Sequence, residues 1–268
     1  MFKWSDKKIE WYERALKESN FAARLADALE PFLTPGESVC ELGCGTGYLS
    51  LELARRGFSV MAVEADKNAA SCLRAKVDQM KFQGQIGMYV DSGSKSPNGS
   101  VAVYQGDWKE ILGSPRWDTI IMCFAGDFRH ELPLYLKSCR GKLLLVTTEP
   151  KDDQEGITGK SAGFRYRLKE SETRKLLDEQ GAAYTITKAS LELGQPFVDM
   201  EEAREYHDAY SVPEEQYNHN LKKMVMSGNP FFPYYLPNHK ELKIYQIFAK
   251  GRSGIAGQRG NPDFAEQH

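Results

Sequence analysis

The segment ELGCGTGYLSLELARRG, residues 41–57, constrains the fold of this chain more than any other. Three glycines, Gly43, Gly45 and Gly47, alternate with other residues between an apolar run and a helical pattern. Glycine permits positive φ angles and lets another group approach the bare backbone, while the start of a helix offers free N–H groups to an anion. We therefore expect a strand, a tight bend and a helix, with a ligand at the bend.

Apolar runs alternate with helical patterns along most of the chain. Strands are predicted at 38–42, 58–65, 101–107, 117–126, 141–150, 183–193 and 243–251. Helices are predicted at 5–33 (two helices), 48–57, 67–81 and 171–181, and their predicted caps are Ser5, Asn20, Asp66 and Ser171. Residues 127–139 are predicted to form a short helix or an irregular crossover. Near-continuous apolar strands alternating with helices predict a doubly wound α/β fold, whose ligands bind at the carboxyl ends of the strands.

The domain organisation follows from where this alternation begins and ends. We expect one domain over residues 1–250, with N-terminal helices at 1–33, and a flexible tail at 251–268. The polar segment 91–100 is expected to be a mobile loop or a hairpin turn. Residues 194–241 separate the last two strands, where a hairpin usually needs about 2–5 residues. We expect this insertion to be a lid that shapes an acceptor pocket together with the N-terminal helices.

Composition limits the compartment and the partners. Lys and Arg total 35 against 37 Asp and Glu, so the basic excess of a strong nucleic-acid binder is missing and nucleic acid is an unlikely partner. The five cysteines are scattered, which favours free thiols in a reducing cytoplasm over disulfides or zinc. The five histidines show no metal-ligand spacing, so no metal is expected. No apolar run is long enough for a membrane span, and the charged N-terminus differs from a signal peptide.

Three kinds of glycine loop compete at the bend. A phosphate-binding GxxxxGK[ST] loop lacks its lysine, and a nicotinamide GxGxxG loop would need glycine where Tyr48 stands. The pattern ExGxGxG resembles motif I of the class I S-adenosylmethionine-dependent methyltransferases. The resemblance implies S-adenosylmethionine as cofactor and a Rossmann-like seven-stranded sheet of order 3-2-1-4-5-7-6, with the seventh strand antiparallel.

The resemblance also implies roles for individual residues. Glu64 ends the second strand, where the family's acid binds both ribose hydroxyls, and Glu41 would contact the methionine amino group. The other cofactor-binding positions that it implies are Tyr12, Gly43, Cys44, Gly45, Gly47, Ala65, Asp107, Trp108, Cys123 and Phe124.

Several of these positions have a plain structural alternative. Glu41 could bond only to its own loop, Asp107 could cap the next helix, and Trp108 could be a core residue. Trp11 and Tyr12 could be aromatic residues packed between two helices rather than a cover over the cofactor.

A catalytic residue is harder to identify. His130 follows the fourth strand with Asp127 and Arg129 and is the candidate general base, against the alternative of a surface imidazole. His207 in the insertion is a second candidate. The stretch FFPYY, residues 231–235, could be an aromatic wall for a planar acceptor or a hydrophobic plug that holds the insertion down.

The predicted function is methyl transfer from S-adenosylmethionine to an O, N or S atom of a small-molecule acceptor. The family's N/D-P-P-Y motif is absent, which argues against DNA amino groups or a release-factor glutamine as the acceptor. The alternatives are a protein or, less favoured, an RNA methyltransferase, and a non-catalytic module that binds the cofactor. A dehydrogenase is a more distant alternative. The oligomeric state stays open.

Overall fold

The computed structural model describes residues 2–88, 99–148, 157 and 168–249. Most of the predicted polar loop and the whole of the predicted tail lie outside these ranges, as do the last residues of the predicted fifth strand. No helix in the described ranges is long and apolar enough to cross a membrane.

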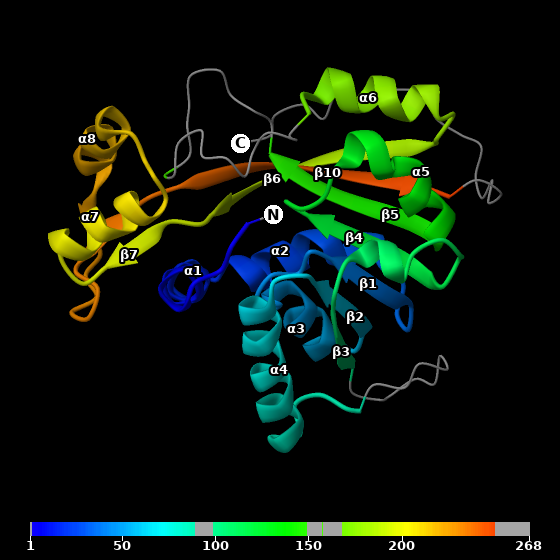
Figure 1. Ribbon diagram of the computed structural model, residues 1–268, viewed down its shortest axis with the longest axis horizontal. Helices are drawn as coiled ribbons and strands as arrows, with labels where there is room; N and C mark the ends of the chain where they lie inside the picture. The colour runs from blue at the N-terminus through cyan, green and yellow to red at the C-terminus, as the bar shows by residue number, and fades with distance from the viewer. Residues whose placement is uncertain (1, 89–98, 149–156, 158–167, 250–268) are drawn as a thin grey trace, which may run out of the picture.

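The main sheet has seven strands in the order β3-β2-β1-β4-β5-β10-β6 (Figure 1). These strands are β1 (Ser38–Leu42), β2 (Ser59–Glu64), β3 (Ser100–Gln105), β4 (Trp117–Cys123), β5 (Cys139–Thr148), β6 (Tyr184–Glu192) and β10 (His239–Phe248). The first five are parallel, and β10 runs antiparallel to both β5 and β6. The predicted order and the antiparallel last strand are confirmed.

Strand β1 lies at the point where the strand order reverses. It pairs in parallel with β2 on one side and with β4 on the other, so that Glu41 stands beside Ala62 and Ile121. Successive residues of a strand face opposite sides of the sheet. Accordingly Val39 lies in one hydrophobic core and Cys40 in the other.

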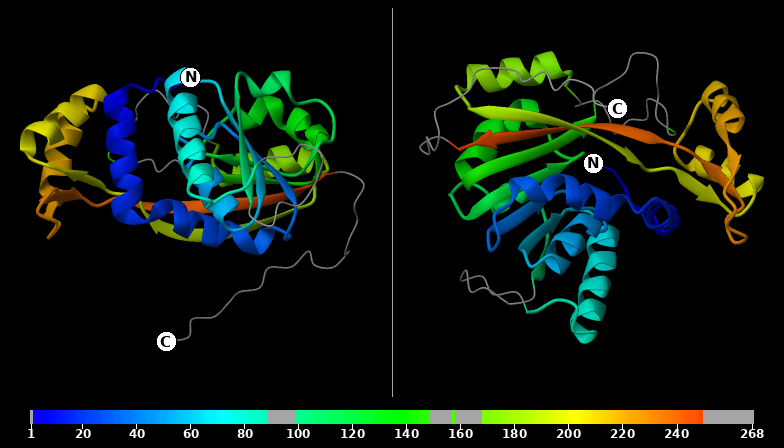
Figure 2. Two further views of the ribbon diagram at one scale, coloured as in Figure 1. Left: turned by 90° about the horizontal axis from the view of Figure 1, so that it is seen from below. Right: turned by 180° about the vertical axis from the view of Figure 1, so that it is seen from behind.

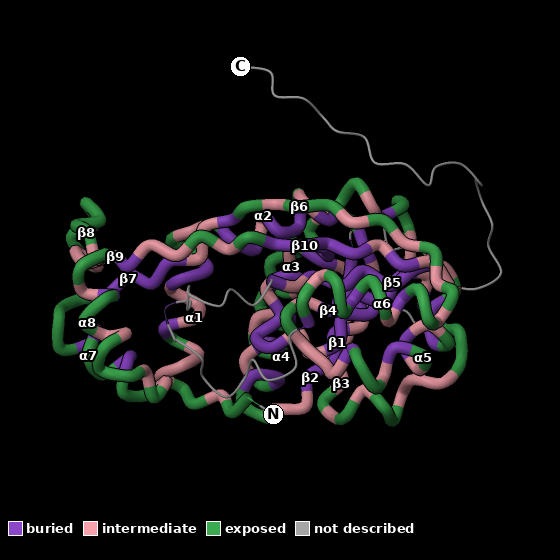
Figure 3. Tube along the Cα trace, turned by 90° about the horizontal axis from the view of Figure 1, so that it is seen from above, coloured by how far each residue is buried: buried purple, intermediate pink, exposed green. Residues whose placement is uncertain are grey.

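Helices cover both faces of the sheet. The helices and 3-10 turns of this layer are α1 (Asp6–Ser19), α2 (Phe21–Leu29), η1 (Glu30–Phe32), α3 (Tyr48–Arg55), α4 (Lys67–Phe82), η2 (Trp108–Glu110), α5 (Phe128–Ser138) and α6 (Glu170–Glu179). Helices α2, α3 and α4 contribute to one core, and α5 and α6 to the other. Figure 3 shows the buried residues concentrated on the central strands and on the helix surfaces that face them.

The predicted helix caps are confirmed at two positions and wrong at two. The Ser5 hydroxyl accepts a bond from Lys8 N, and the Asp66 carboxylate accepts bonds from two amides of α4. Asn20 makes no side-chain cap bond; it stands between α1 and α2 in the left-handed region, with φ 51°, because the chain turns there. Ser171 lies inside α6, which begins one residue earlier, because the Glu172 carboxylate accepts the bond from Lys169 N.

The insertion between β6 and β10 is an ordered unit of its own. It contains β7 (Gln195–Phe197), α7 (Met200–Ala209), α8 (Glu214–Lys223), β8 (Val225–Met226) and β9 (Tyr234–Leu236), and its strands pair in the order β7-β9-β8. It projects from one end of the main sheet beside α1 (Figure 2). A third core joins Trp11 of α1 to Phe197, Ala203, Tyr206 and Leu236. Helix α1 therefore packs on the insertion, and the role of the insertion as a lid over an acceptor pocket stays a prediction.

Candidate functional site

The glycine bend connects the carboxyl end of β1 to α3. Gly43, Gly45 and Gly47 have φ angles of 70°, 57° and 77°. A Cβ atom at Gly43 would lie 2.6 Å from the Ala125 Cβ, and one at Gly47 would overlap the Leu73 side chain. The chain's own packing thus requires glycine at these two positions, whether or not a ligand binds.

Trp4 covers the middle of the bend. Its ring atom Cζ2 lies 3.2 Å from the point where a Cβ atom of Gly45 would stand. Its backbone is anchored beyond β2, since Trp4 N donates to the Asp66 carboxylate at 3.3 Å and Asn68 Nδ2 donates to Trp4 O at 2.8 Å. In the sequence, Trp4 gives no signal of this contact beyond being an apolar residue just before the capping Ser5.

Glu64 turns its carboxylate toward the bend. Oε2 accepts from Gly45 N and Oε1 accepts from Asp66 N, both at 2.8 Å. The residue is buried, and no more than one of the lone pairs on each oxygen is used by these bonds. The predicted ribose-binding acid and the glycine bend are therefore in direct contact.

Glu41 is a second buried carboxyl group at this edge of the sheet. Its Oε2 accepts from the Ser50 hydroxyl, and the side chain is 3% exposed. Burial raises its pKa from 4.5 to about 7, with the nearby Glu64 charge adding to the effect. The bond partner is thus a hydroxyl on α3 and not an amide of the glycine loop as the structural alternative predicted, and the predicted contact with a methionine amino group stays a prediction.

Tyr12 reaches the same region from α1. Tyr12 packs against the same hydrophobic core as Cys44 and Cys123. Burial raises the pKa of its hydroxyl, and the nearby Cys123 and Glu41 raise it further. Its ring lies 5.2 Å from the Trp4 ring. Its neighbour Trp11 points instead into the insertion, so only one of the two aromatic residues could cover a cofactor.

The thiols near the bend are unreactive. Burial raises the pKa of Cys44 and Cys123 well above the usual range, and neighbouring carboxylates raise it further. A thiol with a raised pKa is a poor nucleophile. These residues can only shape the walls of the site.

Thr46 places a buried hydroxyl group in the glycine bend. The residue is fully buried, and its Oγ1 has no hydrogen bond in the described part of the chain. Its carbonyl accepts from Lys76 Nζ at 3.3 Å, and Lys76 is paired with Glu13. A buried hydroxyl without a partner is unfavourable unless a ligand or water satisfies it.

Asp107 and Trp108 follow β3. The Asp107 carboxylate accepts from Lys109 N at 2.9 Å, which is the predicted capping alternative, and the side chain stays exposed. Trp108 is half-buried and donates from Nε1 to Glu131 at 3.1 Å. Both remain predicted adenine contacts, as does Ala65 after β2.

The turn after β4 contains a strained residue. Phe124 has φ 55° and is 41% exposed, with its ring 6.4 Å from that of Phe21. A left-handed conformation costs a non-glycine residue about 1 kcal/mol or more, and such residues gather at binding sites. Its predicted place beneath the methionine portion is consistent with this exposure.

His130 lies on the first turn of α5. Its Nδ1 is 2.7 Å from the Asp127 carboxylate, and its side chain is 73% exposed. The geometry matches a surface imidazole held by Asp127, and the role of general base stays a prediction.

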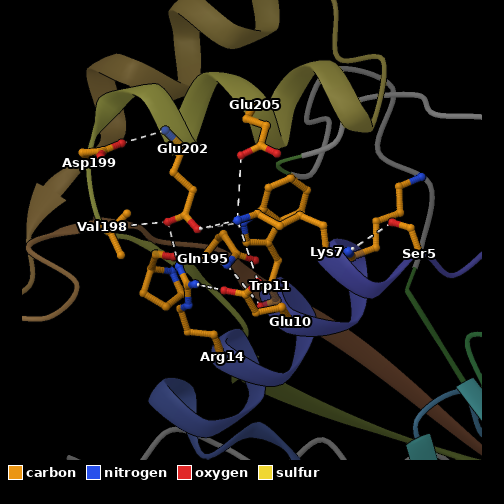
Figure 4. A network of polar contacts seen from close by, with 12 residues as sticks. Ser5, Lys7, Glu10, Trp11, Arg14, Gln195, Val198, Asp199, Glu202 and Glu205 are labelled. Atoms are coloured by element: carbon orange, nitrogen blue, oxygen red, sulfur yellow. Dashed lines mark hydrogen bonds and ion pairs between the residues drawn. The ribbon is translucent and has the colours of Figure 1, made fainter. Parts of the chain in front are cut away.

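Helix α1 is locked to the insertion by a buried carboxylate (Figure 4). Glu202 of α7 accepts from Trp11 Nε1 at 3.1 Å, from Arg14 at 2.7 Å and from Val198 N at 2.8 Å. Hydrogen bonds from Arg14 and Val198 hold the pKa of this carboxyl below its usual range against the opposing effect of burial. Gln195 Nε2 adds a bond to Trp11 O at 3.2 Å.

The other candidates in the insertion have structural roles. His207 is 1% exposed; its Nδ1 bonds to Ala203 O and its Nε2 to Asn220 Nδ2, so both ring nitrogens are satisfied within the fold. Its proposed catalytic role is therefore wrong. In the stretch 231–235, Phe232 packs under Arg14 and Tyr235 donates to Glu192, which is the plug alternative, while Phe231 is 77% exposed.

Within the described ranges, no three His, Cys, Asp or Glu side chains gather as a possible metal site.

Part of the chain is similar to a known protein family. Residues 12–138, just under half of the chain, match the model of a family described as a methyltransferase domain. A probable cobalt-precorrin-6B C(15)-methyltransferase (decarboxylating) from Methanobrevibacter smithii is 28% identical over 83 residues, which are 30% of this chain. The match covers 44% of that relative, so this chain spans less than half of its length.

Two solved structures share the fold. The YcgJ protein of Bacillus subtilis has a TM-score of 0.54 at 12% identity, covering 87% of this chain and 99% of its own. Magnesium protoporphyrin IX methyltransferase from Synechocystis PCC 6803, with bound S-adenosylhomocysteine (SAH), has a TM-score of 0.51 at 16% identity, covering 91% and 95%. At these identities the likeness concerns the fold, and it confirms the Rossmann-like architecture.

Proposed function

We propose that the chain is a class I methyltransferase, as its domain match and its fold suggest, and that it transfers a methyl group from S-adenosylmethionine to an O, N or S atom of a small-molecule acceptor. The observation that carries this proposal is the contact between Glu64 and the glycine bend. This contact puts an acid beside the glycine bend at the switch point of the sheet, where this class of fold binds ligands.

The residues at the switch point fit the adenosyl donor. The Glu64 carboxylate would hold the ribose hydroxyls through lone pairs that its two amide bonds leave free. Glu41 would face the methionine amino group, and the buried Thr46 hydroxyl offers a partner to a polar atom of the ligand. The remaining contacts would come from the backbone of Gly43, Cys44, Gly45 and Gly47 and from Ala65, Asp107, Trp108, Cys123, Phe124 and Tyr12.

S-adenosylmethionine supplies, when bound, a methyl group that is already activated on a sulfonium sulfur. The protein then has to position the acceptor and exclude water, and positioning alone can supply much of the rate enhancement. Trp4 and Tyr12 lie over the bend and the strand ends, where they would shield the site. This arrangement needs no fixed nucleophile, which agrees with the high thiol pKa values of Cys44 and Cys123.

Calorimetry with SAH and, separately, with NAD tests the proposal. We expect SAH to bind and NAD not to bind. Glu64→Ala should weaken SAH binding at least tenfold, whereas Glu179→Ala, at the exposed end of α6, should leave it unchanged. Binding of NAD without SAH would refute the assignment of the donor.

Transfer assays test His130. If it is the general base, His130→Gln lowers the transfer rate without changing SAH affinity. A cytoplasmic location, where the free thiols stay reduced, forms part of the proposal.

A further inference from the structure

One carboxylate ties the turn after β3 to helix α5. Glu131 of α5 accepts from Trp108 Nε1 at 3.1 Å with its Oε2 atom, and its Oε1 atom lies 2.5 Å from Lys109 Nζ. Trp108 and Lys109 both belong to η2, which is capped by the Asp107 carboxylate. Glu131 therefore holds the turn that carries two of the predicted adenine contacts, Asp107 and Trp108.

The Glu131 carboxylate is itself held in place. Tyr135 stands one turn further along α5 and donates its hydroxyl to the same Oε2 atom. Tyr135 is fully buried, and the Glu131 side chain is 14% exposed. An ionised carboxylate only accepts hydrogen bonds, and three donors converge on this one. It therefore presents a fixed acceptor to the indole of Trp108.

The Trp108 ring lies at the switch point of the sheet. Its Cζ3 atom is 3.6 Å from the point where a Cβ atom of Gly43 would stand, and its Cζ2 atom is 3.8 Å from the corresponding point at Gly126. Gly43 follows β1 and Gly126 follows β4. The six-membered half of the indole thus lies between the two bends, while the N–H edge is directed to α5.

We propose that Glu131 is a positioning residue for the methyl donor, because it fixes the indole of Trp108 as one wall of the adenine site. The contact of Trp108 with adenine rests on the proposed function; the hold of Glu131 on the indole rests on the geometry alone. Nucleobases stack on aromatic side chains. A ring that is oriented before the donor arrives does not have to be ordered on binding.

The inference distinguishes Glu131 from a residue that only stabilises the fold. Trp108 is half-buried, so its indole N–H needs an acceptor. If Glu131 acts through Trp108, its removal should matter for the donor only while the indole is present. The effect should also be confined to the adenosine portion of the donor.

Four substitutions in the full chain test this inference. Glu131→Met removes the acceptor at similar size, and Glu131→Gln keeps an oxygen that can accept from the indole. Trp108→Phe removes the indole N–H. Tyr135→Phe is the control, since it removes the other donor to the same oxygen. Calorimetry measures SAH and adenosine affinity, and ¹⁵N NMR follows the Trp108 indole resonance, which is assigned by its loss in Trp108→Phe.

We expect Glu131→Met to shift the Trp108 resonance and to weaken SAH and adenosine by the same factor, about two- to tenfold, the effect of one hydrogen bond. Glu131→Gln should restore both readouts, and Tyr135→Phe should leave SAH affinity unchanged. In the Trp108→Phe background, Glu131→Met should cause no further loss of SAH affinity.

Equal SAH affinity in the wild type and Glu131→Met would overturn the inference, as would the same loss in the Trp108→Phe background. If Glu131→Met fails to fold, Trp108→Phe decides, because unchanged SAH and adenosine affinity in that variant would overturn the inference. If neither ligand binds the wild type, the proposed function fails. The indole resonance then still tests Glu131, since an unshifted resonance in Glu131→Met would show that Glu131 does not orient Trp108.

Discussion

Replacing Glu41 by glutamine should stabilise the protein at alkaline pH and weaken donor binding. Burial raises the Glu41 pKa from 4.5 to about 7, so between these values the folded state keeps a proton that the unfolded state has lost. The free energy of unfolding therefore falls as pH rises through this range and stays low above it. One pKa unit corresponds to about 1.4 kcal/mol, so the raised pKa of Glu41 means that its ionised form lowers the free energy of unfolding of the apo protein by about 3 kcal/mol above pH 7. Glutamine keeps an oxygen for the Ser50 hydroxyl and removes the charge.

Urea unfolding of the apo protein at pH 5 and pH 8.5 measures this effect. We expect Glu41→Gln to gain about 3 kcal/mol at pH 8.5 and less than about 1 kcal/mol at pH 5. Glu52→Gln on α3 is the control and should show no such difference between the two pH values. SAH affinity should fall in Glu41→Gln, because an amide cannot form an ion pair with an amino group. An equal gain at both pH values, or none at pH 8.5, would show that the carboxyl group titrates normally.

Four further substitutions test other parts of the structure. Burial lowers the pKa of His207, so acidification below about pH 6.5 should lower the free energy of unfolding of the wild type by up to about 1.4 kcal/mol per pH unit. In unfolding experiments, His207→Gln should lose this dependence on pH. An unchanged dependence on pH would contradict a buried, neutral His207. Arg14→Met leaves Glu202 buried beside fewer partners and should lower the free energy of unfolding in urea by about 3 kcal/mol; a loss below about 1 kcal/mol would mean that water reaches the pair. Gly43→Ala should lower stability by about 2 kcal/mol and SAH affinity at least tenfold by calorimetry, because both backbone strain and crowding act there. Gly57 also has a positive φ angle but has open space around it, so Gly57→Ala should lower the free energy of unfolding by about 1 kcal/mol and leave SAH binding unchanged. Equal losses of stability in Gly43→Ala and Gly57→Ala would show that crowding is unimportant.

The sheet was predictable because local signals specify it. Apolar runs of strand length, the glycine bend and the Asp66 cap are each readable within a few residues, and the family resemblance supplied the strand order. The two incorrect caps show where local reasoning ends. Asn20 is a suitable capping residue by type, but the angle between α1 and α2 is set by distant packing, and its side chain forms no cap bond.

The contacts that span the sequence were not predictable. Trp4 on Gly45 and the Trp11–Glu202 bond join residues with no local pattern in common, and one tryptophan before a capping serine gives no hint of its partner. The sequence also could not tell that adjacent Trp11 and Tyr12 serve different sites. One helical step of about 100° turns the first into the insertion and the second toward the strand ends. His207 was misjudged because a buried, fully bonded imidazole and a catalytic one look alike in a sequence.

The Trp11–Glu202 bond connects residues 191 positions apart, and it makes the proposed acceptor side of the molecule a discontiguous unit. An engineer who grafts residues 194–241 onto a related scaffold would transplant a carboxylate without its indole and guanidinium partners. The exchangeable module comprises both the N-terminal helix and the insertion. Diversification of acceptor choice in such chains should therefore proceed by paired changes at the two sites, and libraries that randomise one of them alone should yield mostly unstable proteins.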